Sequence, residues 1–267
     1  MVELIIQYFR VKRDTSDPKY GILTRRQREY SHCLRKNLAC EFINSIHILY
    51  ETQDDIMELK RENIDPNHPK IVLYHLGKYM HYKDAYTYAN QYLEGKICIV
   101  LHTDIFLVDG FQNIRPSHLD NKIYALARTN VDDDGTPTGR GIRIYTIPND
   151  PNKYCATIDG WAFVSPLNKD VVTEANHQQN VWGAENRMVY IFRKYGYQVT
   201  TPLSKLKMVH FHKTDIRPNQ NQNWITAEGN LIPATREYYL NVQKKNPHLV
   251  GGGIPKELGC SIITEDL

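Results

Sequence analysis

The chain has 267 residues, of which 41% are hydrophobic and 24% are charged, and this composition suits one large soluble domain or two small ones. Its formal net charge of +3 is too small for a dedicated nucleic-acid-binding protein. The five cysteines include no CxxC pair, which indicates neither a disulfide framework nor a zinc site and fits a reducing compartment. We find no signal peptide and no apolar stretch near the roughly 20 residues of a membrane span, so we expect an unanchored cytoplasmic protein.

Strand-like and helix-like segments alternate over the first hundred residues. In chain order, we expect strands over 2–9, 45–51, 70–76 and 96–102, with helices over 24–38, 54–63 and 83–95 between them. The first helix is expected to begin at Thr24, which matches a capping box with Gln27, and its basic run at 25–28 fits a solvated face. The alternation predicts βαβ units, and therefore an α/β fold with a mostly parallel sheet, flanking helices and a single domain.

Beyond residue 102 this alternation becomes less regular. We expect further strands over 122–128, 154–165 and 207–213, and a helix over 185–197. Side chains alternate along a strand, so His210 and His212 should share one face. From Pro218 onward the chain is rich in Asn, Gln, Pro and Gly. We therefore expect residues 1–217 to form the core of the domain, and residues 218–267 to be an extension of it that wraps the surface.

Four short stretches place polar groups where packing alone does not require them. They read HTDIF at 102–106, DGWAF at 159–163, WGAEN at 182–186 and HFHKTDIR at 210–217. Taken singly, each is explained by a turn, a helix end or an exposed strand face. Asp104, however, directly follows an expected strand, and ligands of parallel sheets bind beyond the carboxyl ends of the strands.

In order and spacing, these stretches resemble the motifs of a GT-A-type glycosyltransferase family with members in bacteria, plants and large algal viruses. The family carries Asn-x-Asp-Ile, Asp-x-Trp-x-Phe, Gly-x-Asp-Asn and His-x-His elements, which here read HTDI, DGWAF, GAEN and HFH. The resemblance covers roughly residues 3–217 and implies the Rossmann-like GT-A fold. This chain departs from the family at His102, where Asn or Asp is usual, at Glu185, where Asp is usual, and at Lys78 and Tyr79, near a common Arg.

The resemblance implies that a sugar is transferred from a nucleoside diphosphate sugar, most simply a UDP-sugar, to a hydroxyl of a carbohydrate acceptor. A divalent ion stabilises the departing diphosphate, and Mn²⁺ tolerates imidazole ligands better than Mg²⁺ does. We expect Asp104, His210 and His212 to hold this ion. The residues expected to contact the nucleotide are Tyr8, Phe9, Arg10, Lys78, His102, Thr103, Asp104, Arg128 and Lys213.

The acceptor hydroxyl must lose a proton, and a carboxylate is a suitable base. Glu185 and Asp159 are the two candidates, and Glu185 at a helix start is favoured because the resemblance implies an inverting reaction. Acceptor contacts are expected from Trp161, Trp182 and Asn186.

Two other functions fit parts of the sequence. A sugar-phosphate nucleotidyltransferase would use a similar sheet, although residues 8–21 lack the glycine-rich loop expected after the first strand. An inactive sugar-binding module of the same fold is favoured by His102. The sequence indicates no partner beyond the sugar nucleotide and a glycan.

Overall fold

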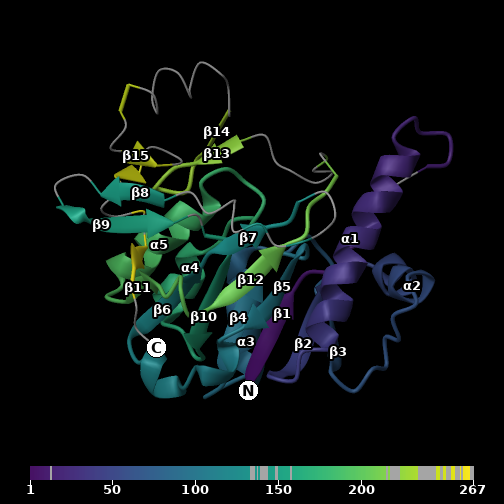
Figure 1. Ribbon diagram of the computed structural model, residues 1–267, viewed down its shortest axis with the longest axis horizontal. Helices are drawn as coiled ribbons and strands as arrows, with labels where there is room; N and C mark the ends of the chain where they lie inside the picture. Colours follow the sequence, from purple (N-terminus) through teal and green to yellow (C-terminus); the bar gives the residue numbers. More distant parts are fainter. Residues whose placement is uncertain are drawn as a thin grey trace.

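The computed structural model describes residues 1–12, 14–132, 136, 138, 144–147, 150–156, 158–214, 216, 223–233, 245–246, 249–250, 254–255, 259 and 261–264. An eight-stranded mixed sheet forms the centre of the molecule (Figure 1). Its strands, in spatial order, are β17 (Ile262–Ile263), β11 (Gln198–Thr201), β6 (Lys122–Leu126), β10 (Gly160–Val164), β4 (Ile97–Leu101), β1 (Val2–Ile6), β2 (Ile43–Tyr50) and β3 (Ile71–His75). The chain is therefore an α/β protein with a mostly parallel sheet and flanking helices, as its sequence predicts.

The helices cover both faces of this sheet. They are α1 (Tyr20–Leu38), α2 (Gln53–Arg61), α3 (Tyr82–Tyr92), α4 (Lys169–Glu174) and α5 (Ala184–Lys194), with 3-10 turns at Phe111–Asn113 and Pro116–Leu119. All residues of β1 and β4 are buried, as is typical of central parallel strands. Ile5 and Val100 pack in the cluster that contains α3 and α5, whereas Leu4 and Ile99 pack in the cluster that contains α1. The two core layers thus follow the alternation of side chains along each strand.

Four smaller β elements complete the part of the chain that the structure describes. β5 (Ile105–Asp109), β12 (Lys207–His210) and β7 (Arg128–Asn130) form a second sheet with β12 in the middle. The remaining pairs are β8 (Ile144–Ile147) with β9 (Asp150–Ala156), β13 (Asn223–Ile225) with β14 (Leu231–Pro233), and β15 (Leu249–Val250) with β16 (Ile254–Pro255). The carboxyl-terminal extension also contributes β17 to an edge of the main sheet, beside β11, so it does more than cover the surface.

Several predicted boundaries are wrong. α1 begins at Tyr20, and the Thr24 hydroxyl donates to the Tyr20 carbonyl inside the helix, so the expected capping box at Thr24 does not start it. The expected strand over 154–165 is divided between β9 and β10, and β12 ends at His210.

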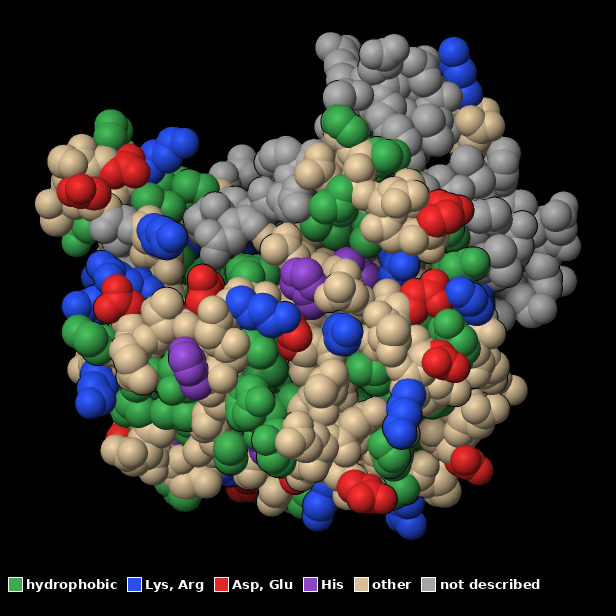
Figure 2. Space-filling view, turned by 180° about the vertical axis from the view of Figure 1, so that it is seen from behind, with side chains coloured by type: hydrophobic (Ala, Val, Ile, Leu, Met, Phe, Trp, Pro, Cys, Tyr) green, Lys and Arg blue, Asp and Glu red, His purple; other side chains and the backbone are tan. Residues whose placement is uncertain are grey.

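Basic and acidic side chains are interspersed over the face opposite to Figure 1, as Figure 2 shows, in keeping with the small net charge. Among the described residues, no helix combines the length and apolarity needed to cross a membrane.

Candidate metal centre

The ends of several strands bring the polar stretches together. β10 runs antiparallel to β4 and β6, so Gly160 at its start pairs with Leu101 and Leu126 at their ends. Asp159 consequently lies beside the segment that follows β4, where His102 and Asp104 are found. Gly160 has no space for a side chain, because a Cβ there would come within 2.3 Å of Leu101 Cδ2. The polar stretches therefore meet at the carboxyl edge of β4, and this edge is where we expect ligands of such a sheet to bind.

Asp104, His210 and His212 form a group of potential metal ligands. Their ligand atoms all lie within 4.8 Å of one another. His210 Nε2 lies 2.9 Å and His212 Nδ1 3.7 Å from Asp104 Oδ2. The Phe211 amide donates to the Asp104 carbonyl at 2.9 Å, which fixes the segment after β12 beside the segment after β4. Two imidazoles and one carboxylate are a ligand set for a divalent transition-metal ion.

The protonation states of this group also fit a divalent cation. Burial alone would raise the pKa of the Asp104 carboxyl. The nearby His210, Arg26 and His102 lower this pKa by more than burial raises it, so it lies well below its ordinary value. Burial lowers the pKa of His210 in spite of the nearby Asp104 carboxylate. Asp104 is therefore ionised and His210 neutral near pH 7, and these are the forms that bind metals.

The tautomer of His210 strengthens this assignment. Asn130 Oδ1 accepts a hydrogen bond from Arg128 Nε at 3.3 Å, which identifies that atom as the amide oxygen. His210 Nδ1 lies 3.2 Å from the same oxygen and must donate to it. With His210 Nδ1 bonded to Asn130, Nε2 is the ring nitrogen that faces Asp104 Oδ2, at 2.9 Å, and is placed to share a cation with that carboxylate.

Arg26 is the main site residue that the sequence did not reveal. It lies within the basic run at 25–28, yet it is 3% exposed. Its NH2 group donates to Asp104 Oδ2, its NH1 group donates to Glu29 Oε2 at 2.7 Å, and its guanidinium lies 4.5 Å from the centre of the Tyr30 ring. Helical spacing was the available signal, since Arg26 shares a face of α1 with the buried Tyr30 and Leu34.

Glu29 extends this network to the segment beyond the histidines. Its carboxylate accepts hydrogen bonds from the backbone amides of Lys213 and Thr214, at 3.0 and 2.8 Å. The Lys213 amide is thus used to position the segment, while its side chain is exposed. Arg26 and Glu29 together connect α1 to both sides of the metal-ligand group.

The two candidate bases have different surroundings. Gly183, with a φ of 82° that favours glycine, precedes α5 and places Glu185 in the first turn. Glu185 Oε1 lies 3.5 Å from His102 Nε2, so His102 faces this carboxylate and is not part of the metal-ligand group. Asp159 contacts Arg128 through one oxygen, and its other oxygen, Oδ2, is buried with no hydrogen-bond partner among the described residues.

The residues after β1 are more enclosed than a base-binding role suggests. Tyr8 has no exposed surface, and its hydroxyl lies 2.9 Å from Ser31 Oγ, while burial raises its pKa to about 12. Phe9 is 9% exposed and packs edge-on against Tyr30, with ring centroids 5.1 Å apart. Tyr8 therefore presents no face to a nucleotide in this structure, because it is a core residue.

The remaining nucleotide candidates are held by neighbouring elements. Arg10 NH1 pairs with Asp54 of α2 at 2.7 Å, and Lys78 Nζ pairs with Asp84 of α3 at 2.8 Å. The Thr103 hydroxyl donates to the Gln7 carbonyl and joins the ends of β4 and β1. Among the expected phosphate-binding cations, Arg128 is linked to the metal-ligand group through Asn130, which contacts both Arg128 and His210.

Of the residues expected to contact the acceptor, Trp161 lies in the core and Trp182 lies at the surface. Trp161 has no exposed surface and packs against Phe192, so it is a core residue. Trp182 is 44% exposed and its ring lies 5.5 Å from that of Trp224, which the sequence analysis missed. Asn186 donates to the Gly259 carbonyl at 2.9 Å. Trp182 and Trp224 together form an aromatic pair beside the start of α5.

No protein-family model matches the chain, and no curated protein sequence matches it. Among solved structures, it is similar to HddC from Yersinia pseudotuberculosis, with 13% identity, a TM-score of 0.36 and coverage of 66% of this chain and 81% of that one. It is also similar to a mannosyltransferase from Pyrobaculum calidifontis in complex with GDP-Man and Mn²⁺, with 10% identity, a TM-score of 0.44 and coverage of 78% and 56%. GalNAc-T7 with UDP, GalNAc and Mn²⁺ gives 12% identity, a TM-score of 0.45 and coverage of 80% and 43%. The chain thus spans about half the length of the last two proteins.

Proposed function

We propose that the chain is a metal-assisted glycosyltransferase that moves a sugar from a nucleoside diphosphate sugar, a UDP-sugar in the simplest case, to a hydroxyl of a carbohydrate acceptor. The observation that carries this proposal is the group of Asp104, His210 and His212 at the carboxyl edge of β4. Glu185 and Asp159 flank it through His102 and Arg128. The metal-ligand group suits stabilisation of the departing diphosphate, and the carboxylates of Glu185 and Asp159 suit removal of the proton from the acceptor hydroxyl.

Asp104, His210 and His212 would hold Mn²⁺ or Mg²⁺, and the bound ion would supply Lewis-acid stabilisation to the diphosphate. Arg26 orients the Asp104 carboxylate, and Asn130 fixes the tautomer of His210. Arg128 adds a fixed positive charge at the same edge, where phosphate oxygens accept charge-assisted hydrogen bonds.

Glu185 is the base in this proposal. It takes the proton from the acceptor hydroxyl while that oxygen attacks the anomeric carbon opposite the departing diphosphate, so one displacement inverts the configuration. His102 Nε2 lies 3.5 Å from the Glu185 carboxylate, on the side of the segment that carries Asp104. Asp159 suits this task less well, because its contact with Arg128 stabilises the deprotonated form. The exposed Trp182 offers a flat apolar face to the acceptor sugar.

A screen of nucleotide sugars by thermal unfolding, with Mn²⁺ and with EDTA, tests the proposal. We expect at least one nucleoside diphosphate sugar to raise the melting temperature only when Mn²⁺ is present. The best donor is then supplied with glycan acceptors, and NMR follows the anomeric configuration of the product. Retention of the donor configuration would refute the inverting mechanism. Release of pyrophosphate from UTP and a sugar phosphate, without sugar transfer, would identify a nucleotidyltransferase instead.

A further inference from the structure

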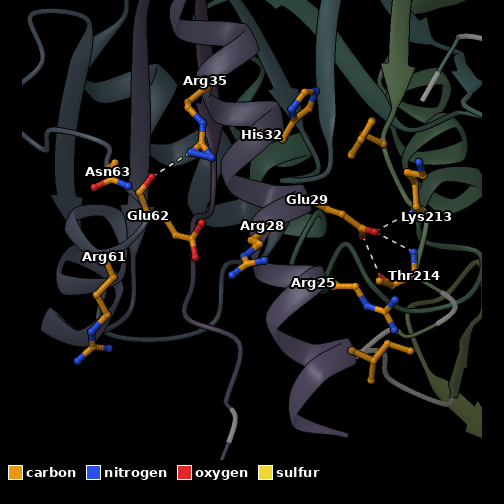
Figure 3. Close-up of a pocket in the computed structure, with 12 residues that line it drawn as sticks. Arg25, Arg28, Glu29, His32, Arg35, Arg61, Glu62, Asn63, Lys213 and Thr214 are labelled. Atoms are coloured by element: carbon orange, nitrogen blue, oxygen red, sulfur yellow. Dashed lines mark hydrogen bonds between the residues drawn. The ribbon is translucent and has the colours of Figure 1, made fainter. Parts of the chain in front are cut away.

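A hollow of about 890 Å³ lies along the exposed face of α1 (Figure 3). The helix forms its floor, the end of α2 lines one side and the segment after β12 lines the other. We call it the α1 groove, and its lining residues are Ile22, Arg25, Arg28, Glu29, His32, Arg35, Arg61, Glu62, Asn63, Phe211, Lys213 and Thr214. A hollow of this size is large enough for several sugar units.

Positive charge is concentrated in the α1 groove. Five of its lining residues are Arg or Lys and two are Glu, and this excess of three charges equals the formal net charge of the entire chain. Arg25, Arg28 and Arg35 are exposed and lie on one face of α1 with His32 between them. At 1.5 Å per residue, the row extends over about 15 Å.

The charges in this row are available to a ligand. Within the part of the chain that the structure describes, Arg25 and Arg28 have no ion-pair partner. Arg35 donates only to the carbonyl of Glu62, at 2.9 Å, which neutralises none of its charge. The Glu29 carboxylate faces inward to Arg26 and to the amides of Lys213 and Thr214, so it offsets little of the positive charge outside.

The α1 groove adjoins the metal-ligand group. Phe211 and Lys213, on either side of His212 in the chain, line the groove, and Phe211 stacks on His32 with ring centroids 4.3 Å apart. Glu29 contributes to the groove wall and also bonds Arg26, which bonds Asp104. An extended ligand in the groove would therefore lie against the same segment that carries His212.

We infer that the α1 groove binds the acceptor, and that the acceptor is an acidic glycan with carboxylate groups repeated along its chain. This inference rests on the proposed function. A single small anion would need cations that converge on one point, whereas these are spread along a row. Phe211 and His32 stack on each other and do not form the series of open rings that bind unstacked bases. Only Ile22 and Phe211 are apolar, so the groove also lacks the apolar anchors of a membrane-binding face.

Two matched probes test the ligand class with the unmodified chain. Hexagalacturonate carries six carboxylates, and its methyl ester is the same chain without charge. We expect hexagalacturonate to bind in calorimetry, with an affinity that falls as salt is added. We expect its ester to bind at least about tenfold more weakly, which is a loss of about 1.4 kcal/mol in binding free energy. Equal binding of the two probes would overturn the inference, as would tighter binding of a single-stranded oligonucleotide or of vesicles containing phosphatidylserine.

Paired variants test the location. Arg25→Gln combined with Arg28→Gln removes two groove charges and retains polar side chains of similar helix propensity. The control combines Lys169→Gln with Lys205→Gln, which removes two exposed charges outside the groove. We expect the groove variant to bind hexagalacturonate about tenfold more weakly and the control to bind it as the unmodified chain does. Equal losses in both variants would overturn the assignment to the groove.

The groove and the transferase can fail independently. Binding of UDP with Mn²⁺ is measured separately on the unmodified chain. If UDP does not bind but hexagalacturonate binding depends on Arg25 and Arg28, the proposed transferase is rejected and the groove remains a binding site for acidic glycans. If UDP binds with Mn²⁺ but hexagalacturonate does not bind, the acidic acceptor is rejected and the transferase remains.

Discussion

Replacing Asp104 by Asn tests the metal centre with the least change in shape. The Asp104 and Arg26 side chains are 10% and 4% exposed, so the substitution removes one of the two buried carboxylates that pair with Arg26 and leaves Glu29 as the other. Breaking a buried pair in this way costs about 3–5 kcal/mol. The amide oxygen can still accept from Arg26, and a hydrogen bond to a charged group returns about 1.5–3 kcal/mol. We expect a net loss of about 2 kcal/mol in the free energy of unfolding at pH 7 with EDTA.

The same substitution should remove the response to metal. Mn²⁺ at a hundredfold excess over its dissociation constant stabilises a native protein by about 2.7 kcal/mol, and we expect the Asn variant to lose most of this gain. Urea unfolding followed by circular dichroism, with Mn²⁺ and with EDTA, measures both effects. Asp109→Asn, at the exposed end of β5, is the control and should retain the full response. Full stabilisation of Asp104→Asn by Mn²⁺ would refute the assignment of the centre.

The pH dependence provides an independent check of the ion pair. The pKa of Asp104 is lowered in the folded chain, so its ionised form stabilises the fold at pH values above the ordinary carboxyl value near 3.9. This contribution is lost as the pH falls below that value, where the unfolded chain takes up the proton first. The difference between Asp104→Asn and the unmodified chain should therefore shrink below about pH 4. A constant difference from pH 7 to pH 3 would contradict a buried, charged Asp104.

Three further predictions concern single groups. Glu185→Gln should lower turnover by about a hundredfold to ten-thousandfold and leave Mn²⁺-dependent UDP binding intact, and an unchanged rate would exclude Glu185 as the base. His210→Ala and His212→Ala should each weaken Mn²⁺ binding in calorimetry by at least about tenfold, and unchanged binding in both would leave the pair as structural residues. Burial, together with the adjacent Arg187, lowers the pKa of His177 to about 3. His177 should therefore reduce the free energy of unfolding by about 2 kcal/mol between pH 7 and pH 5, because the unfolded chain takes up a proton that the folded chain does not. His177→Gln should abolish this reduction.

The order of helices and strands in the first hundred residues could be predicted from the sequence. β4 is a continuous apolar run and β1 is apolar except for Glu3, because helices cover both faces of the sheet. Such runs can be recognised in a single sequence. The position of β10, antiparallel between β4 and β6, could not be predicted. The pairing of strands that are distant in the chain depends on how the whole domain packs. The hydrophobic periodicity of a segment does not indicate which strand it pairs with. The same holds for β17, whose partner β11 lies more than 60 residues earlier.

The candidate site was partly predictable for a similar reason. Asp104 follows an apolar strand, and His210 and His212 alternate in a short segment, so local patterns indicated all three. Arg26 was missed because its neighbours Arg25 and Arg28 are exposed, and the charged run suggested that Arg26 was exposed too. A charged residue on the buried face of a helix needs an opposite charge, and this requirement is visible only when the partner is known. The structure supplies Asp104 from a segment 78 residues away.

The charge of the metal centre leads to a last prediction. His102 stands where the resembled family carries Asn or Asp, and it faces Glu185, so Asp104 is the one carboxylate in the group. Arg26 pairs with that carboxylate as well as with Glu29, and His210 is neutral, so the centre attracts a divalent cation only weakly until a diphosphate adds its own negative charge. Mn²⁺ and UDP should therefore each bind at least about tenfold more tightly when the other is present, and linkage requires the two factors to be equal. Calorimetric titration of Mn²⁺ with and without UDP, and of UDP with and without Mn²⁺, measures both factors. If Mn²⁺ binds equally well without UDP, then either Arg26 does not compensate Asp104 or the ion binds elsewhere.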